Sequence, residues 1–537
     1  MKPSAAGTTL AHAVMSVVRA HGIDTLFGIP GTHNLELYRP LEPLGFRVVT
    51  TRHEQGSVFA ADGWAATTGK PGVVITTSGP GLLNALSAAA MEWAESRPLL
   101  LLSPGEPRGS ARAARIGALH ETKDAVGAAG SVLTWSRRVT CASSTMDALA
   151  DAFALFATGR PGPVHIELPR DLMSEPWPAP VPRLPEPRPL PLPPADDLEH
   201  ACSLLTAAAQ PVILAGGGAA GAGAALRALA ERLGAPIITT VNGKGTVPET
   251  HPLVVGSDIR LPQVQNLVAQ ADALLVVGSD IGDAELWGGA LQPAGPLLRI
   301  DLDESQARDT LSPTLCLIGD AKAVLDALLA RITADAPRPV WADVVALRTA
   351  VRAEVRAAQP ELARIADSIA AAIPDDAIIG GDSSRITYLA TSSLFPTSRP
   401  RQLLYMPTYA TLGYGLPAAL GAKLAAPERC VLALVGDGAL MFSIQEFVTA
   451  VEQKVCLPVI CVDNGGYEEI RESMIDEGLA PLGVDLVQPD WPALARALGG
   501  AGFTATARNV GAVLKEALQL DCPSIVHVTV SRNPIER

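Results

Sequence analysis

Residues 431–471 contain the spacing most suggestive of chemistry. Gly436-Asp437-Gly438 follows one apolar run, and Asn464 follows the next after 25 intervening residues. The Asp437 carboxylate and the Asn464 side-chain carbonyl are hard oxygen donors of the kind that Mg²⁺ prefers. The glycines allow the backbone to come close to phosphate oxygens. This spacing therefore predicts a site for a metal ion and a diphosphate group.

The segments around these residues must bring them together. The runs VLALV (431–435) and LPVICV (457–462) are predicted to be buried strands, and residues 439–455 have apolar side chains at helical spacing. Together they form a βαβ unit, whose strands are parallel. Both motif ends then reach the same edge of a sheet, where open α/β sheets bind ligands.

The same alternation of strands and helices occurs in three blocks of the chain, which predicts an α/β protein with three doubly wound parallel-sheet domains. Ten of the nineteen residues in 176–194 are proline, which favours a stiff extended tether between domains. A second transition lies between 334 and 359. The predicted domains are 1–175, 195–335 and 356–537. The run GGGAAGAG (216–223) is interpreted as a strand-to-helix turn; a dinucleotide loop is the alternative.

Composition excludes several classes of function. The 537 residues are 48% hydrophobic and have a net charge of −13, which argues against a nucleic-acid partner. No signal peptide and no apolar run long enough to cross a bilayer are evident, so we expect a cytoplasmic protein without a membrane partner. The seven cysteines form no CxxC pair and are predicted to be buried thiols.

Residues 50–86 (TTRHEQGSVFAADGWAATTGKPGVVITTSGPGLLNAL) place Glu54 at a predicted helix start after a strand. Alone, such an acid could simply interact with the helix dipole. Together with the later GDG and Asn464, however, the order of parts resembles the acetolactate synthase and pyruvate decarboxylase family of thiamine diphosphate-dependent enzymes over essentially the whole chain. The resemblance implies that the first domain binds the pyrimidine of the cofactor and the third binds its diphosphate. The second is the central domain.

The resemblance also implies roles for individual residues. Glu54 would hydrogen-bond N1′ of the aminopyrimidine of thiamine diphosphate, and Asp437, Asn464 and the Gly466 carbonyl would hold Mg²⁺. Leu412 would support the bent cofactor, although packing in the core is an equal alternative, and the Ala410 carbonyl would accept from N4′. Further predicted cofactor-binding residues are Ser383, Ser384, Gly436, Gly438, Ala439 and Tyr467.

Two histidines are candidates for proton transfer. His120, in GALHETKD, stands where pyruvate decarboxylases have histidine and acetolactate synthases have glutamine. Imidazole titrates near neutral pH and can act as a general acid, so His120 is a predicted catalytic residue, with His33 second; a structural role is the alternative. Thr32 stands where pyruvate decarboxylases have an acid, which argues against their simple mechanism. All three are predicted to contact substrate.

Glu469 is the predicted determinant of substrate choice, because family members have a pocket residue about five positions after the Mg²⁺-binding asparagine. A carboxylate there could pair with a guanidinium or an ammonium group. Interaction with a helix dipole is the equal alternative, and Glu468 and Asp283 are further candidates for the pairing. Strings such as GIPGTHNLELYRPLE and APLGVDLVQPDWPALARALG resemble the branch containing 5-guanidino-2-oxopentanoate (2-ketoarginine) decarboxylase.

The resulting hypothesis is non-oxidative decarboxylation of a 2-oxo acid, such as one with a basic tail, to an aldehyde and carbon dioxide. An acetolactate synthase-like carboligase is the main alternative, and a non-catalytic cofactor-binding scaffold is a remote one. FAD is unlikely, because DIGDAELW follows ALLVVGS where an arginine-bearing segment is expected. The resemblance also implies a homodimer or homotetramer with active sites at the subunit interface.

Overall fold

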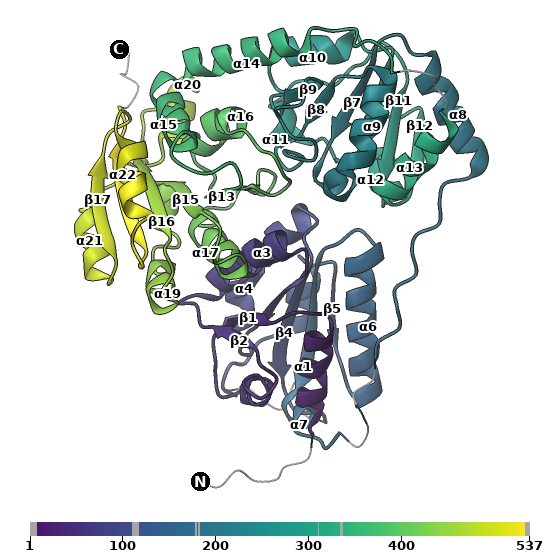
Figure 1. Ribbon diagram of the computed structural model, residues 1–537. Helices are drawn as coiled ribbons and strands as arrows, with labels where there is room; N and C mark the ends of the chain where they lie inside the picture. The colour runs from purple at the N-terminus through teal and green to yellow at the C-terminus, as the bar shows by residue number, and fades with distance from the viewer. Residues whose placement is uncertain are drawn as a thin grey trace. The chain divides into compact units, whose positions relative to one another are not determined.

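The computed structural model describes residues 8–109, 117–177, 180, 183–309, 311–332 and 337–531 (Figure 1). Its strands form three six-stranded sheets, and neighbouring strands in each pair in parallel. Helices lie between successive strands along the chain, except between β8 and β9. The predicted α/β class with three parallel sheets is confirmed.

Sheet 1 is built from the amino-terminal third of the chain. Its strands are β1 (Thr25–Gly28), β2 (Arg47–Val49), β3 (Gly72–Ile75), β4 (Leu99–Gly105), β5 (Trp135–Arg138) and β6 (Pro163–Pro169). The helices are α1 (Leu10–Ala20), α2 (Leu35–Tyr38), α3 (Glu54–Thr68), α4 (Pro80–Ala94), α5 (Ala125–Gly130), α6 (Ala142–Thr158) and α7 (Arg170–Met173). The strand order is β2-β1-β3-β4-β6-β5.

Sheet 2 follows the proline-rich segment, whose described residues 183–194 form no helix or strand. Its strands are β7 (Pro211–Ala215), β8 (Ile237–Thr239), β9 (Val254–Gly256), β10 (Ala273–Val277), β11 (Leu297–Asp301) and β12 (Leu315–Ile318). The helices are α8 (Ala195–Ala207), η2 (Gly217–Ala222), α9 (Gly223–Leu233), α10 (Pro262–Ala269), α11 (Asp283–Leu286), α12 (Glu304–Asp309) and α13 (Ala321–Arg331). The strand order is β12-β11-β10-β7-β8-β9.

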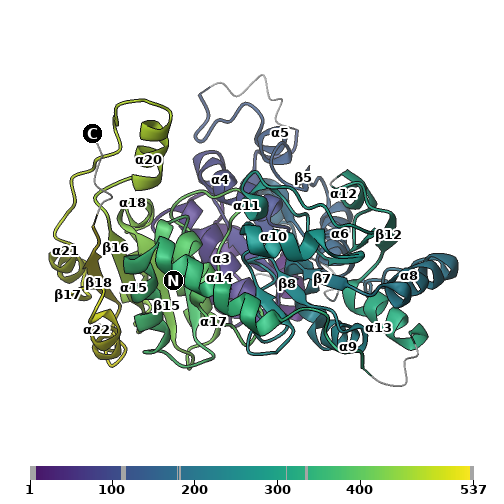
Figure 2. The same ribbon diagram turned by 90° about the horizontal axis from the view of Figure 1, so that it is seen from above.

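Sheet 3 contains the GDG and Asn464 segment. Its strands are β13 (Ile378–Gly381), β14 (Leu403–Leu404), β15 (Val431–Gly436), β16 (Pro458–Asp463), β17 (Ala501–Ala505) and β18 (Ser524–Thr529). The helices are α14 (Val344–Ala358), α15 (Pro360–Ala370), the π-helix η3 (Ile386–Thr391), α16 (Ser392–Leu394), α17 (Gly415–Ala425), α18 (Asp437–Leu440), α19 (Glu446–Glu452), α20 (Glu468–Asp476), α21 (Trp491–Ala497) and α22 (Val510–Ala517). Helices α21 and α22 lie on opposite sides of strands β17 and β18 (Figure 2).

Sheets 1 and 3 have the same topology, because the order β14-β13-β15-β16-β18-β17 repeats that of sheet 1 strand for strand. In each sheet the chain reverses its direction of travel across the sheet between the first and third strands. Ligands of open parallel sheets bind at such a reversal, beyond the carboxyl ends of the strands. The fold therefore provides two equivalent places for a site, at the β1/β3 and the β13/β15 boundaries.

Contacts divide the chain into two compact units. Unit 1 comprises Met1–Pro189, Pro417–Pro427 and Ser443–Val455, and unit 2 comprises Leu190–Leu416, Glu428–Phe442 and Cys456–Arg537. In unit 2 a single hydrophobic cluster includes both Leu274 of β10 and Ile379 of β13, so sheets 2 and 3 share a core. The three predicted domain ranges, which follow the sheets and not these contacts, stay a prediction.

Helices α3 and α17 pack closely within unit 1. A Cβ atom added at Gly63 would lie 1.9 Å from the Ala418 carbonyl oxygen, and one added at Gly421 would lie 1.8 Å from the Ala60 carbonyl oxygen. Two reciprocal glycines thus bring the two backbones into contact. The helix that begins with Glu54 is held by a segment more than 350 residues away in the sequence.

The cysteines follow the prediction only in part. Cys202, Cys316 and Cys461 are buried, but Cys141 is exposed, so the prediction of buried thiols is wrong there. Cys141 caps the start of α6, and a helix end lies at the surface and not in the core. Within the described ranges, no helix has the length and apolar character needed to span a bilayer.

Candidate active site

The residues predicted to bind metal and diphosphate meet at the carboxyl ends of the neighbouring strands β13, β15 and β16 of sheet 3. Asp437 directly follows β15 as the first residue of α18, and Asn464 directly follows the neighbouring strand β16. Ser384, which follows β13, accepts a hydrogen bond through its Oγ atom from the Gly436 backbone N–H at 2.9 Å. The site thus lies where the topology of sheet 3 predicts one.

Asp437 is a buried carboxylate with incomplete hydrogen bonding. It is 1% exposed, and burial, with the nearby Asp463 carboxylate, raises its pKa to about 6. Its Oδ1 atom accepts from the Asn464 backbone N–H at 3.4 Å, whereas Oδ2 has no hydrogen-bond partner in the described part of the chain. Buried polar atoms normally have partners, so this oxygen suits a ligand that the protein alone does not supply.

The Asn464 side-chain amide lies between two other acceptors, Asp437 Oδ1 and the Gly466 carbonyl oxygen. The Asn464 side-chain oxygen lies 2.9 Å from the Gly466 carbonyl oxygen and 3.2 Å from Asp437 Oδ1. Acceptors so close repel one another unless a cation lies among them or the amide turns over to present its NH₂ group. A carboxylate, an amide oxygen and a backbone carbonyl are the donor set that a hard divalent cation takes. The described residues include no alternative group of three His, Cys, Asp or Glu side chains suited to a metal.

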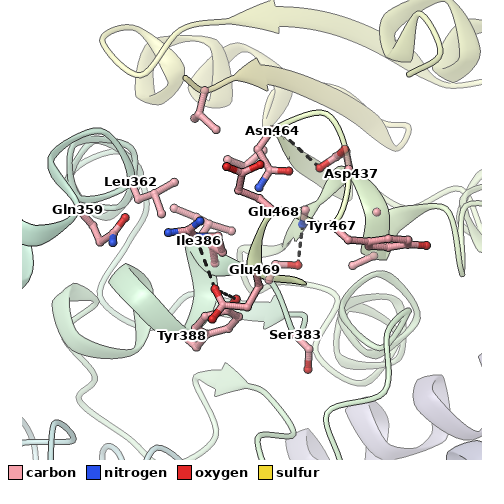
Figure 3. A pocket seen from close by; sticks show the side chains of 18 of the residues that line it. Gln359, Leu362, Ser383, Ile386, Tyr388, Asp437, Asn464, Tyr467, Glu468 and Glu469 are labelled. Atoms are coloured by element: carbon pink, nitrogen blue, oxygen red, sulfur yellow. Dashed lines mark hydrogen bonds and ion pairs between the residues drawn. The ribbon is translucent and has the colours of Figure 1, made fainter. Parts of the chain in front are cut away.

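A cavity of about 630 Å³ opens beside these oxygens (Figure 3). Every residue predicted to bind the cofactor, Glu54 excepted, lines it together with Glu469: Ser383, Ser384, Ala410, Leu412, Gly436, Asp437, Gly438, Ala439, Asn464, Gly466 and Tyr467. Thiamine diphosphate needs room of this order, since small-molecule sites measure about 300–1,000 Å³. Asp283 is not among the lining residues and is exposed on α11.

Asp382 holds the loop that carries Ala410 and Leu412. This acid is 1% exposed and accepts from the backbone N–H groups of Gly413 at 3.2 Å and Gly415 at 2.7 Å. Burial raises its pKa to about 6, while these hydrogen bonds oppose the rise. Ala410 has a left-handed backbone with φ of 53°, an unfavourable conformation for alanine that the anchored loop maintains. The Ala410 carbonyl therefore has a defined direction.

Glu469 lies in an ionic network at one side of the cavity. Tyr388 of η3 donates a hydrogen bond through its hydroxyl to Glu469 Oε2 at 3.0 Å, and Figure 3 shows the two side chains pointing toward each other. Arg385 Nε lies 3.8 Å from the same oxygen, and Arg385 Nη1 lies 2.7 Å from Glu472 Oε1. The neighbouring Glu468 is buried and lies 3.7 Å from Arg471 Nη1. Glu469 is thus the acid of α20 that faces the cavity with half of its side chain exposed.

Glu54 occupies the corresponding edge of sheet 1. It is 7% exposed at the start of α3, and its Oε2 atom accepts from Asn84 Nδ2 at 3.0 Å. A Cβ atom at Gly81 would lie 3.1 Å from Oε1, so this glycine leaves room beside the carboxylate. Burial, and secondly the Glu54 charge, raise the pKa of Tyr38. Glu54 is therefore a buried acid at the start of α3, the helix that follows β2.

His33 and His120 are brought together by Ser78. The Ser78 hydroxyl lies 2.7 Å from His33 Nδ1 and 3.2 Å from His120 Nδ1, and the two rings contact edge to face with centroids 5.0 Å apart. His33 follows β1 and Ser78 follows β3, so the cluster lies at the β1/β3 boundary. Thr32 is exposed in the same turn as His33. Sequence reasoning identified both histidines but not the serine that connects them.

Glu446 fixes the backbone that precedes Glu54. Its carboxylate is completely buried, and Oε1 accepts from the backbone N–H groups of Arg52 and His53, each at 3.1 Å. Oε2 accepts from the Thr449 hydroxyl at 2.7 Å. Burial raises the Glu446 pKa, and these hydrogen bonds oppose the rise. Nothing in the sequence marks this acid, because the backbone N–H groups that it binds lie almost 400 positions away.

Comparison with known proteins identifies the class. Three models of the thiamine pyrophosphate enzyme family match the chain: the N-terminal binding domain at residues 8–128, the central domain at 198–328 and the C-terminal binding domain at 386–528. The chain belongs to this family, and the predicted use of thiamine diphosphate agrees with it. The third match contains Asp437, Asn464 and most of the residues that line their cavity.

Individual relatives extend over most of the chain. A probable 2-ketoarginine decarboxylase of Pseudomonas aeruginosa is 39% identical over 92% of this chain and 89% of its own length. The large subunit of acetolactate synthase isozyme 1 of Escherichia coli is 32% identical over 85% of this chain and 82% of its own. A probable acetolactate synthase large subunit of Methanocaldococcus jannaschii is 30% identical over 84% and 80%, respectively.

The hydrogen bonds of Glu446 lead to a test. Glu446→Ala would remove the acceptor of the Arg52 and His53 backbone N–H groups, two partly buried hydrogen bonds that together contribute roughly 1–3 kcal/mol. We expect faster hydrogen exchange over residues 50–56, measured by mass spectrometry, and a lower temperature of unfolding. Glu446→Gln retains an acceptor oxygen and should change less, and Thr449→Val removes only the hydroxyl. Unchanged exchange in Glu446→Ala would show that the start of α3 is held by other contacts.

Proposed function

We propose that this chain is a thiamine diphosphate- and Mg²⁺-dependent decarboxylase that converts a 2-oxo acid with a basic tail to an aldehyde and carbon dioxide. The observation that supports a basic tail is the position of Glu469, which lines the same cavity as Asp437 and Asn464. The similarity to a probable 2-ketoarginine decarboxylase agrees with this choice. A substrate such as 5-guanidino-2-oxopentanoate combines the oxo acid with a guanidinium group.

Asp437, Asn464 and the Gly466 carbonyl would hold Mg²⁺ through the oxygens that converge beside the cavity. The lining backbone and Ser383 would hold the diphosphate, Leu412 would support the bent cofactor, and the Ala410 carbonyl would accept from its amino group. Thiamine diphosphate supplies, when bound, a carbanion nucleophile and an electron sink for decarboxylation. The protein contributes binding, orientation and the placement of protons.

Protons would be handled by the residues of sheet 1. Glu54 would hold a proton against the aminopyrimidine ring, and its burial keeps water from competing for that hydrogen bond. His120, coupled through Ser78 to His33, would transfer a proton to the reacting carbon atom before the aldehyde leaves. The family resemblance supports a homodimer or homotetramer in which Glu54 of one subunit faces the diphosphate site of another.

Product analysis tests the reaction. We expect the purified enzyme with thiamine diphosphate and Mg²⁺ to release carbon dioxide from 5-guanidino-2-oxopentanoate and to form one equivalent of 4-guanidinobutanal. An acetolactate synthase-like carboligase would instead form a 2-hydroxyketone or an acetohydroxy acid from pyruvate. Carbon dioxide should be measured together with product identity by mass spectrometry. Carboligation products without aldehyde would overturn the decarboxylase proposal.

The role of Glu54 is tested by Glu54→Gln. Loss of the carboxylate should lower kcat by about 10²–10⁴-fold, the usual contribution of a positioned acid–base group. Binding of thiamine diphosphate, followed by calorimetry, should remain, because the diphosphate residues are intact. Turnover equal to that of the unmodified enzyme would exclude Glu54 from cofactor activation.

Specificity is tested at Glu469. Glu469→Gln should lower the ratio of kcat/KM for 5-guanidino-2-oxopentanoate over 2-oxohexanoate, whose tail carries no charge, by about 10-fold. The effect is moderate because the half-exposed carboxylate is screened by water. Glu477→Gln is a matched control, since Glu477 is exposed at the end of the same helix and does not line the cavity. An unchanged ratio in Glu469→Gln would remove this residue from substrate recognition.

A further inference from the structure

Two acids one helical turn apart approach the same arginine. Glu469 and Glu472 both extend from α20 toward Arg385, whose side chain is only 12% exposed. The contacts are unequal: Arg385 lies 2.7 Å from Glu472 but 3.8 Å from Glu469. The shorter is a charge-assisted hydrogen bond, whereas the longer is only an electrostatic approach. Glu472 is therefore the stronger partner of Arg385, and Glu469 is the weaker one.

The acids also differ in their relation to the cavity. Arg385 and Glu469 belong to its lining, whereas Glu472 is not among the described lining residues. Glu472 thus binds the guanidinium from outside the cavity. Tyr388 orients Glu469 through one oxygen, and a carboxylate can accept further hydrogen bonds.

The charge balance of this cluster matters for a cationic ligand. One guanidinium between two carboxylates leaves one negative charge in excess. The other acid of this helix that lies near the cavity, Glu468, faces its own arginine, Arg471, which also lies 3.6 Å from Asp485. Within the Arg385 cluster, the carboxylate without a close guanidinium contact is Glu469, which lines the cavity.

We infer that Glu472 is a specificity-determining positioning residue: its close contact with Arg385 weakens the pairing of Arg385 with Glu469 and so keeps Glu469 available to the basic tail of the substrate. This inference rests on the proposed function. Without Glu472, the nearby Arg385 guanidinium would pair with Glu469, because a largely buried cation is destabilised unless a carboxylate compensates its charge. The chain's own arginine would then occupy the position of the substrate's cationic group.

The test is a double-mutant cycle on the holoenzyme at low and high ionic strength, using 5-guanidino-2-oxopentanoate, which has a cationic tail, and 2-oxohexanoate, whose tail is neutral. Glu472→Gln should lower the cationic-to-neutral ratio of kcat/KM by about fivefold at low salt, as expected for a partly exposed ion pair, and by less at high salt. The kcat/KM for 2-oxohexanoate should not change. Glu472→Gln combined with Arg385→Gln should restore the ratio, because the competing guanidinium is gone.

The other outcomes would contradict either this inference or the proposed function. An unchanged ratio in Glu472→Gln, while Glu469→Gln lowers it, would overturn this inference and leave the proposed function standing. A double variant as impaired as Glu472→Gln alone would also overturn it, since damage to the helix is not repaired by removing Arg385. No cationic preference in the unmodified enzyme would instead contradict the proposed function. Glu472→Ala provides a second variant of the same contact should Glu472→Gln fold poorly.

Discussion

The parallel pairing of strands in sheets 1 and 3 is the constraint on which both candidate sites depend. Parallel strands point their carboxyl ends to one edge, so polar residues that follow different strands must meet there. In sheet 3 this edge brings Asp437 and Asn464 together, and in sheet 1 it brings His33 to Ser78. Both sheets reverse their strand order at the same place. The same topology therefore positions the candidate residues of sheet 1 and those of sheet 3.

Three buried acids differ in whether the protein supplies all of their hydrogen-bond partners. Asp382 and Glu446 are almost completely buried, and both have backbone N–H groups as partners, so their burial stabilises the loops that they hold. Asp437 is equally buried, but one of its oxygens has no such partner among the described residues. Burying a carboxylate without partners costs several kcal/mol, roughly, unless a ligand compensates. The incomplete acid is therefore the one expected to bind a cation.

Under the proposed function, substrate choice would depend on a balance of charges and not on a single side chain. Glu469 would be an ordinary surface acid without the Tyr388 hydroxyl that orients it. Arg385 lies close enough to neutralise it but is bound more tightly by Glu472. The π-helix η3 carries Tyr388 and begins next to Arg385, and such irregular helices are common at functional sites. Recognition of a basic tail would thus arise from several elements of unit 2 acting together.

The class of fold, the family and the use of thiamine diphosphate follow from the amino-acid sequence alone, whereas the individual cofactor-binding residues stay a prediction. Strand periodicity, the GDG–Asn464 spacing and Glu54 are local patterns, and parallel pairing converts such patterns into positions at a sheet edge. Only the tertiary structure showed that Glu446 holds the start of α3, that Ser78 joins two histidines and that Arg385 lies between two acids. These contacts connect residues up to almost 400 positions apart, and no local pattern encodes them, because they depend on how distant helices pack.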